Sequence, residues 1–161
     1  MKDDPFVQTL IGFLITSKQI SGNDHEIALK GHGPKLSNAE HKILQYILER
    51  FQQDSFQPPG VEEIQQNAES RASAVPELVK LCVGQGELVD IGQGVLLHTQ
   101  WEKELRSRIK KELLDREKMS VAEIRDLLGT TRKFAIPICE YLDRIELTKR
   151  DGDFRILASS Q

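Results

Sequence analysis

An internal repeat is the feature that most constrains the fold of this chain. Three pairs of matching stretches follow one another in the same order, about sixty residues apart: VEEI at 61–64 with VAEI at 121–124, Val75-Pro76 with Ile136-Pro137, and Glu87-Leu88 with Glu146-Leu147. Repeats of this length are typical of a small domain that occurs twice. The sequence therefore predicts two copies of one fold in tandem.

The first copy reads as three helices and a β-hairpin. A helix is predicted from Ser37 to Phe51, because Ser37 and Glu40 form a capping box and apolar residues recur along one face. Shorter helices are predicted at 61–68 and 73–83. The runs ELVDI and VLLHT then read as two strands joined by a glycine-containing turn.

The second copy repeats this order. A long charged helix is predicted at 101–118, a short one in MSVAEIRDLLG and a third in TTRKFAIPICEYLDR. A second hairpin follows, and Asp151-Gly152 supplies its turn. Three helices followed by a strand pair make a winged helix, which is a helix-turn-helix with an appended hairpin. We therefore expect a mostly α chain with small β-hairpins, an α+β fold of tandem winged-helix domains.

The expected domain boundaries follow from the repeat. Residues 36–99 form the first complete winged-helix domain and residues 100–161 the second. In residues 1–35, Phe6–Ile15 resembles the end of a third helix and the residues after it resemble a wing. We interpret this segment as the C-terminal remnant of a preceding winged helix. On that interpretation the chain is a C-terminal fragment of a longer protein, and whether Met1 is a natural start stays open.

Composition narrows the class of protein. The sequence contains no run of eighteen apolar residues, so no membrane span is expected. Cys82 and Cys139 are far apart and lie in helical apolar patterns, which predicts buried thiols and no disulfide framework. The formal net charge is −3, and the part after residue 103 is mildly basic whereas the part before it is acidic. We expect a monomeric cytoplasmic protein of which only the last part meets a polyanion.

No chemistry of its own is expected from this chain. The four histidines are scattered, without a Cys or a second His at metal-ligand spacing. The glycine-rich GHG and GQG stretches lack the Lys-Ser/Thr of a phosphate-binding loop. Carboxylate pairs such as Glu62-Glu63 suit the start of a helix. We therefore predict no catalytic residue, no metal site and no cofactor, and we interpret the chain as a binding module.

The third helix of the second copy holds the candidate binding site. Gly129 is expected to end the preceding helix, and Thr130 or Thr131 to cap the next one. The free amides of the first turn of a helix attract phosphate. Arg132 and Lys133 lie on that turn, where cations oppose the helix dipole unless an anion is nearby. The pattern predicts a nucleic-acid contact, and the alternative is a solvated basic pair beside carboxylates of a neighbouring element.

The predicted wing adds cations to this site. Lys149, Arg150 and Arg155 are expected to lie close to one another across the hairpin, although Asp151 and Asp153 dilute their charge. The first copy has no cations at the matching start of its third helix. Only the second copy is therefore expected to grip a polyanion.

Two residues of the second copy have more than one interpretation. Phe154 is assigned to the core face next to Ile156, with a stacking surface as the alternative. Pro137 lies inside the third helix and is expected to kink it. Because Pro76 occupies the matching place in the first copy, packing is favoured as the reason for the proline over an aiming of the helix start.

The residues of the second copy also resemble a known family. The run MSVAEIRDLLGTTRKFAIPICEYLDRIELTKRDGDFRIL closely resembles the last winged helix of the bacterial selenocysteine-specific elongation factor. The matching stretches are Ile124-Arg125-Asp126, Gly129-Thr130-Thr131-Arg132-Lys133, Pro137, Glu140-Tyr141-Leu142-Asp143-Arg144 and Thr148-Lys149-Arg150. Residues 36–99 resemble the penultimate winged helix of the family, with its Pro-Pro loop, and HEIALKGHGPKLS resembles the end of the unit before it. The resemblance spans essentially the whole chain.

The resemblance implies a function. In this family a GTPase and tRNA-binding part, which holds GTP and magnesium, precedes several winged helices, and that part is absent from this chain. The last winged helix of the family binds an mRNA stem-loop, the selenocysteine insertion element, beside an in-frame UGA codon. It thereby tethers GTP and selenocysteyl-tRNA to the ribosome at that codon, which raises their effective concentration. By this resemblance the chain is an RNA-binding fragment and not an enzyme.

The residues that the resemblance marks as RNA-binding share two places, the helix start and the wing: Thr130, Thr131, Arg132, Lys133, Arg150 and Arg155. Two departures from the family pattern are the acidic residues at the wing turn and Leu142, which replaces a commoner aromatic and is expected to affect packing. Functions of two other classes stay open, a tandem winged-helix DNA-binding regulator and a protein-interaction module. DNA binding predicts Arg, Asn or Gln along the groove-facing side of a long basic helix, whereas here the cations stop after the first turn.

Overall fold

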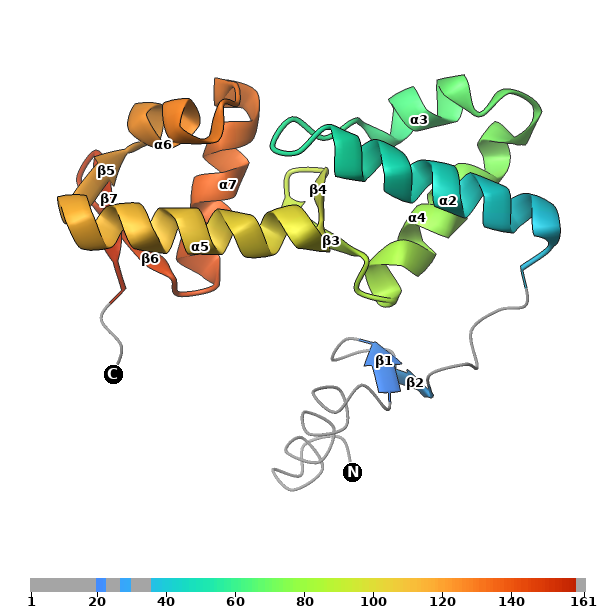
Figure 1. Ribbon diagram of the computed structural model, residues 1–161, viewed down its shortest axis with the longest axis horizontal. Coiled ribbons are helices and arrows are strands. Elements are labelled where there is room, and N and C mark those ends of the chain that lie inside the picture. Colours follow the sequence, from blue (N-terminus) through green and yellow to red (C-terminus); the bar gives the residue numbers. More distant parts are fainter. Residues whose placement is uncertain (1–19, 23–26, 30–35, 159–161) are drawn as a thin grey trace.

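The computed structural model describes residues 20–22, 27–29 and 36–158. Strand β1 (Ile20–Gly22) pairs antiparallel with β2 (Ile27–Leu29), as the predicted hairpin near the start of the chain requires. The helix end predicted at Phe6–Ile15 lies outside the described residues. Residues 36–158 form two units side by side (Figure 1), each with three α-helices and a β-hairpin.

The first unit follows the predicted order. Its elements are α2 (Asn38–Gln53), α3 (Val61–Asn67), the 3-10 helix η1 (Glu69–Ala74), α4 (Val75–Gly84), and the hairpin of β3 (Leu88–Gly92) and β4 (Val95–His98). The predicted capping box is present, because the Glu40 amide donates to Ser37 Oγ at 3.2 Å and the Ser37 amide donates to the Glu40 carboxylate at 2.7 Å. Ile47, Phe51 and Ile64 are the largest side chains buried in this core.

The third helix of the first unit differs from the prediction. It was expected from residue 73, but a 3-10 helix occupies Glu69–Ala74 and the α-helix begins at Val75. Pro76 consequently lies in the first turn of α4. Backbone N–H groups of the first turn have no acceptor within the helix, so proline, which lacks this group, loses no hydrogen bond there. The first unit has no Gly-Thr-Thr sequence that ends one helix and caps the next at this place.

The second unit contains α5 (Thr99–Arg116), β5 (Lys118–Ser120), α6 (Val121–Leu128), α7 (Arg132–Arg144), β6 (Thr148–Asp151) and β7 (Phe154–Leu157). The three strands form one antiparallel sheet in the order β5-β7-β6. Helix α7 continues through Pro137, whose side chain is buried inside the unit. The expected α+β fold with winged-helix units is therefore observed, and β5 is an addition to the predicted elements.

The core of the second unit contains side chains from both units. The buried cluster of the second unit includes Phe56 from the loop after α2, and Ile91, Val95 and Leu97 from the first wing. Strand β3 packs directly against α7. The predicted boundary between residues 99 and 100 falls in the first turn of α5, which follows β4 without a linker. The first wing is thus part of the second unit's interior.

The face of the second unit's sheet that packs against the core is the opposite of the one predicted. Arg155 is buried and Leu157 packs against the core, so the inward face of β7 carries these two residues. Phe154 and Ile156 are half-buried on the outer face, and the Lys118 ammonium lies 4.7 Å from the centre of the Phe154 ring. The prediction that Phe154 belongs to the core is wrong, because strand side chains alternate between faces and Arg155, held by Asp143, takes the inward face with Leu157.

Among the helices that the structure describes, none has both the length and the apolar character that a bilayer crossing requires.

Candidate nucleic-acid interface

The turn between α6 and α7 is built as the sequence predicts. Gly129 ends α6 in the left-handed conformation, with a φ of 61°. This conformation favours glycine at the position. Thr131 has an extended backbone and is the N-cap of α7, but its hydroxyl makes no capping hydrogen bond to a described residue. Because α7 begins at Arg132, the N–H groups of Arg132 and Lys133 have no helical acceptor. The helix start therefore presents two free amides.

Two exposed cations stand on this helix start. Arg132 and Lys133 are both exposed, and the first turn of α7 contains no acidic residue. Among the side chains that the structure describes, none forms an ion pair with either cation; Lys133 instead lies 5.3 Å from the centre of the Phe134 ring. The alternative that neighbouring carboxylates neutralise this pair has no support in the described part of the chain.

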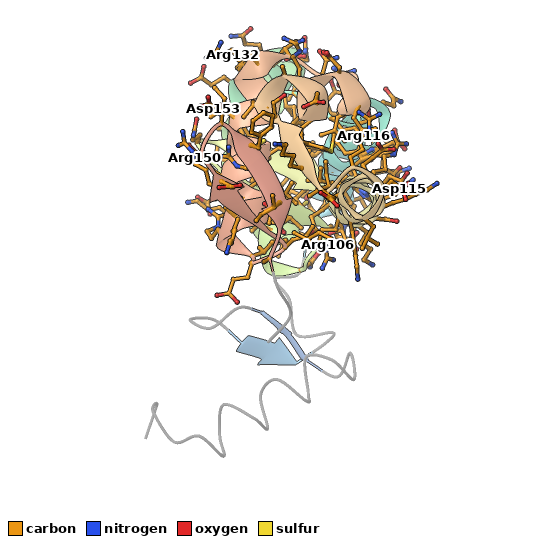
Figure 2. The ribbon with its side chains drawn as sticks, turned by 90° about the vertical axis from the view of Figure 1, so that its left-hand side faces the viewer. Arg106, Asp115, Arg116, Arg132, Arg150 and Asp153 are labelled. Carbon is orange, nitrogen blue, oxygen red and sulfur yellow. The ribbon has the colours of Figure 1, made fainter. Side chains whose placement is uncertain are left out.

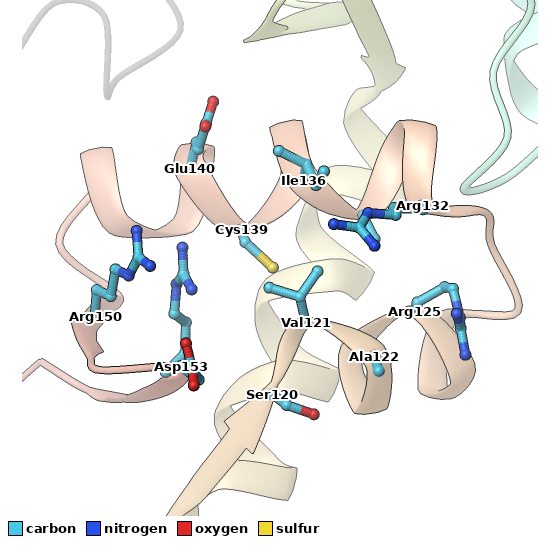
Figure 3. A pocket seen from close by; sticks show the side chains of 12 residues that line it. Ser120, Val121, Ala122, Arg125, Arg132, Ile136, Cys139, Glu140, Arg150 and Asp153 are labelled. Atoms are coloured by element: carbon cyan, nitrogen blue, oxygen red, sulfur yellow. The ribbon is translucent and has the colours of Figure 1, made fainter.

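A groove runs from this helix start to the wing. It has a volume of about 430 Å³, and its apolar floor includes Val121, Ala135 and Cys139. Figure 3 shows Arg132 at one end of the groove and Arg150 at the other, with Cys139 and Val121 between them. The charged side chains that line the groove are Arg125, Arg132, Glu140, Arg150, Asp153 and Arg155.

The groove keeps an excess of positive charge. Its arginines outnumber its two carboxylates, and Glu140 already accepts a hydrogen bond from Gln93 at 2.6 Å. Arg125 is paired outside the groove with Asp126 at 2.6 Å. Arg132 and Arg150 are exposed at its two ends, and Figure 2 shows both along one edge of the molecule, away from Arg116 on α5. The arrangement suits a polyanion that contacts both ends.

The predicted wing residues divide between the two faces of the sheet. Arg150 and Arg155 are cross-strand partners, as expected, and both line the groove. Lys149 pairs with Ile156 on the outer face, so the expected cluster of all three cations is not formed. Arg155 is 7% exposed, and its Nε donates to Asp143 Oδ2 at 3.0 Å. Part of the Arg155 guanidinium is therefore used within the protein.

The two threonines also differ. Thr131 is exposed at the helix start. Thr130 is partly buried, and its Oγ1 donates to the carbonyl oxygen of Phe56 at 2.6 Å. The roles predicted for both residues in RNA binding stay predictions, but Thr130 is directed toward the first unit.

Two further residues belong to this site and were not predicted from the sequence. Arg125 lines the groove from α6, although the prediction placed cations only on the third helix and the wing. Gln57 lies in the loop after α2, and its Nε2 donates to the carbonyl oxygen of Gly129 at 3.0 Å. No local pattern could reveal Gln57, because the contact joins positions 72 residues apart.

In the part of the chain that the structure describes, no three His, Cys, Asp or Glu side chains are grouped as a metal site requires.

The chain is similar to known proteins of one kind. Residues 111–157 match the family model described as elongation factor SelB, winged helix. The selenocysteine-specific elongation factor of Desulfomicrobium baculatum is 26% identical over 149 residues, which cover 92% of this chain and 24% of that protein. This chain resembles the winged-helix region of SelB. The resemblance that the sequence indicates is thus confirmed, and the chain spans about a quarter of the length of its SelB relative.

Solved structures agree with the SelB resemblance. The mRNA-binding domain of SelB from E. coli, solved in complex with SECIS RNA, is 25% identical with a TM-score of 0.64, covering 77% of this chain and all of that domain. A bacterial selenocysteine-specific elongation factor, EF-Sec, is 21% identical with a TM-score of 0.60 and covers 95% of this chain and 24% of that one. The second likeness supports the fold alone.

Proposed function

We propose that this chain binds an mRNA stem-loop, the selenocysteine insertion element, through the start of α7 and the arginine groove beside it. The observation that carries the proposal is the pair of exposed cations, Arg132 and Lys133, on a helix start whose first turn holds no carboxylate. The structure of the SelB domain that is 25% identical to this chain was solved in complex with SECIS RNA, which supports the same class of ligand.

The groove suits a hairpin loop better than a duplex. The major groove of an A-form helix is too deep and narrow for side chains to read, so proteins recognise RNA at loops and unstacked bases. Phosphates on the two sides of a loop would meet the α7 amides with Arg132 at one end and Arg150 at the other. An unstacked base would lie against the apolar floor at Val121 and Cys139.

The binding serves a longer factor in this proposal. A GTPase part outside this chain would hold GTP and magnesium and carry selenocysteyl-tRNA. Attachment to the hairpin would keep that complex on the cytoplasmic ribosome near an in-frame UGA codon, so that the codon is decoded. Tethering of this kind raises the effective concentration of the tRNA without any new contact at the codon. The chain itself would bind as a monomer and catalyse nothing.

Duplex DNA and a protein partner are the alternative ligands. A DNA-reading helix carries Arg, Asn or Gln along its groove-facing side. Beyond its first turn, the face of α7 that lines the groove instead carries Ala135, Ile136 and Cys139. This composition favours RNA loops over duplex DNA.

The test is the fluorescence anisotropy of a labelled selenocysteine insertion hairpin titrated with the chain at several salt concentrations. Arg132→Ala and Arg150→Ala are each expected to weaken binding about tenfold and to lower the log–log salt slope by about one. Lys111→Ala, which removes an exposed cation from α5, serves as the matched control and is expected to bind like the parent. Equal affinity for duplex DNA, or full affinity in both groove variants, would contradict the proposal.

A further inference from the structure

The loop between α2 and α3 holds the turn that precedes α7. Thr130 Oγ1 donates to the carbonyl oxygen of Phe56 at 2.6 Å, and Gln57 Nε2 donates to the carbonyl oxygen of Gly129 at 3.0 Å. The two bonds therefore hold consecutive residues of the turn, Gly129 and Thr130, close to the free amides of Arg132 and Lys133. Phe56 and Gln57, the partners in these two bonds, belong to the first unit. In Figure 1 this loop reaches across to the start of α7.

The loop itself is firmly anchored in the second unit. Phe56 is 2% exposed, and its ring lies in the core of the second unit. The Trp101 ring meets it edge-on with the centres 5.7 Å apart, and the Arg108 guanidinium lies 5.6 Å from its centre. Trp101 Nε1 also donates to the carbonyl oxygen of Gln52 at 2.8 Å, which fixes the end of α2. The loop is thus a rigid support for the turn.

The first unit also holds the other end of α7. Gln93 in the turn of the first wing donates to Glu140 at 2.6 Å, and Arg144 donates to the carbonyl oxygen of Asp90 at 3.2 Å. Ile91 of the same hairpin is buried in the second core. Helix α7 is therefore fixed at its start by the loop and along its C-terminal half by the wing, both of which belong to the first unit.

We propose that the first winged helix positions the RNA-binding start of α7, and that Thr130 and Gln57 are the positioning residues. The inference rests on the proposed function. A binding site is effective when supporting contacts hold its groups within about half an ångström of the productive geometry. The loop bonds remove the need to order the turn when RNA arrives, so they lower the cost of binding. Thr130 then acts through Arg132 and Lys133, without contacting RNA.

Replacement of Thr130 provides the sharpest test. Thr130→Val keeps the shape of the side chain and removes the hydroxyl, whereas Thr130→Ser keeps the hydroxyl. We expect Thr130→Val to weaken binding of the hairpin about fivefold, the range of one neutral hydrogen bond, and Thr130→Ser to stay within about twofold of the parent. Trp101 fluorescence is expected to match the parent in both, which separates positioning from loss of the fold.

A double-mutant cycle distinguishes positioning from direct contact. If Thr130 acts through Arg132, the effect of Thr130→Val falls below about twofold in the Arg132→Ala background. If Thr130 touches RNA itself, the full effect persists in that background and the inference is overturned. Unchanged binding by Thr130→Val in the parent background overturns it as well.

Gln57→Ala tests the second bond in the same assay. It is expected to weaken hairpin binding a few-fold, about as much as Thr130→Val. Gln53→Ala, at an exposed glutamine at the end of α2, is the matched control and is expected to bind like the parent. If Arg132→Ala weakens binding while Gln57→Ala and Thr130→Val do not, the RNA interface stands and the positioning role is overturned. If the parent chain does not bind the hairpin, the proposed function itself fails.

Discussion

Each unit buries one cysteine thiol in its core. Cys82 lies in the core of the first unit and Cys139 in that of the second, on the floor of the groove. Burial is the main reason that the pKa of each thiol is raised to about 11. A thiol with so high a pKa carries little thiolate at neutral pH and reacts slowly.

Thiol labelling tests this state of the two cysteines. At pH 8 the folded chain is expected to react negligibly with a disulfide reagent, and to react at both cysteines once guanidinium unfolds it. Because the folded pKa lies above the unfolded value, each thiol adds stability below about pH 9 that is lost as the pH rises toward about 11. Fast labelling of the folded parent, with Cys82→Ala showing which thiol reacts, would contradict the burial.

Residues of the site were predictable where the cause is local. The placement of Cys139 follows from apolar spacing, and the exposure of Arg132 from its position on a helix start. The burial of Arg155 was not predictable. Side chains of a strand alternate between two faces, and the local sequence does not indicate which of the two faces the core. The partner of Arg155, the Asp143 carboxylate, lies on another element.

The junction between α7 and the wing depends on one carboxylate. Asp143, in the last turn of α7, accepts from Thr148 Oγ1 at 2.6 Å and from Arg155 Nε at 3.0 Å. The Arg155 side chain is 9% exposed and that of Asp143 26% exposed. This carboxylate therefore joins the helix to both strands of the hairpin and sets the position of Arg150 relative to α7.

Removal of that carboxylate is expected to loosen the wing. Asp143→Ala leaves the nearly buried Arg155 without its partner, and we expect a loss of about 2 kcal/mol in the free energy of unfolding. For a chain of this length, that loss lowers the melting temperature by about 4 to 8 °C, measurable by calorimetry. Asp153→Ala, an exposed aspartate at the wing turn, is the control. If Asp143→Ala melts at the same temperature as the parent, the ion pair contributes nothing to the free energy of unfolding.

Elements with strong local signals were predicted, and those that depend on distant pairing were not. Helix α7 has a glycine before it, an N-cap threonine and a continuous apolar face, so its existence and approximate bounds could be read directly. Strand β5 has only three residues and exists because Lys118 to Ser120 pair with β7, far along the chain. The 3-10 helix of the first unit likewise has no clear sequence signal.

At the scale of the whole molecule, the repeat hides an asymmetry. The two copies are similar in sequence, but the first donates Phe56 and its wing side chains to the core of the second. The second copy alone carries a basic helix start. The repeat predicts two complete copies of one fold. It could not predict that side chains of the first copy enter the core of the second, because each copy contains a complete set of elements and periodicity does not reveal which faces meet.

Because side chains of the first unit lie in the core of the second, we expect residues 36–158 to unfold as one cooperative body. Ile47→Ala creates a cavity in the first core, away from α7, and is expected to cost about 2 to 5 kcal/mol. If the units are coupled, the variant shows one transition at a lower temperature, with the calorimetric enthalpy equal to the van't Hoff enthalpy. The fluorescence of Trp101, the single tryptophan, should then change together with the far-UV circular dichroism. Two separate transitions, one of them at the parent's melting temperature, would mean that the second unit keeps its fold without the first. Helix α7 would then not depend on the first unit for its position.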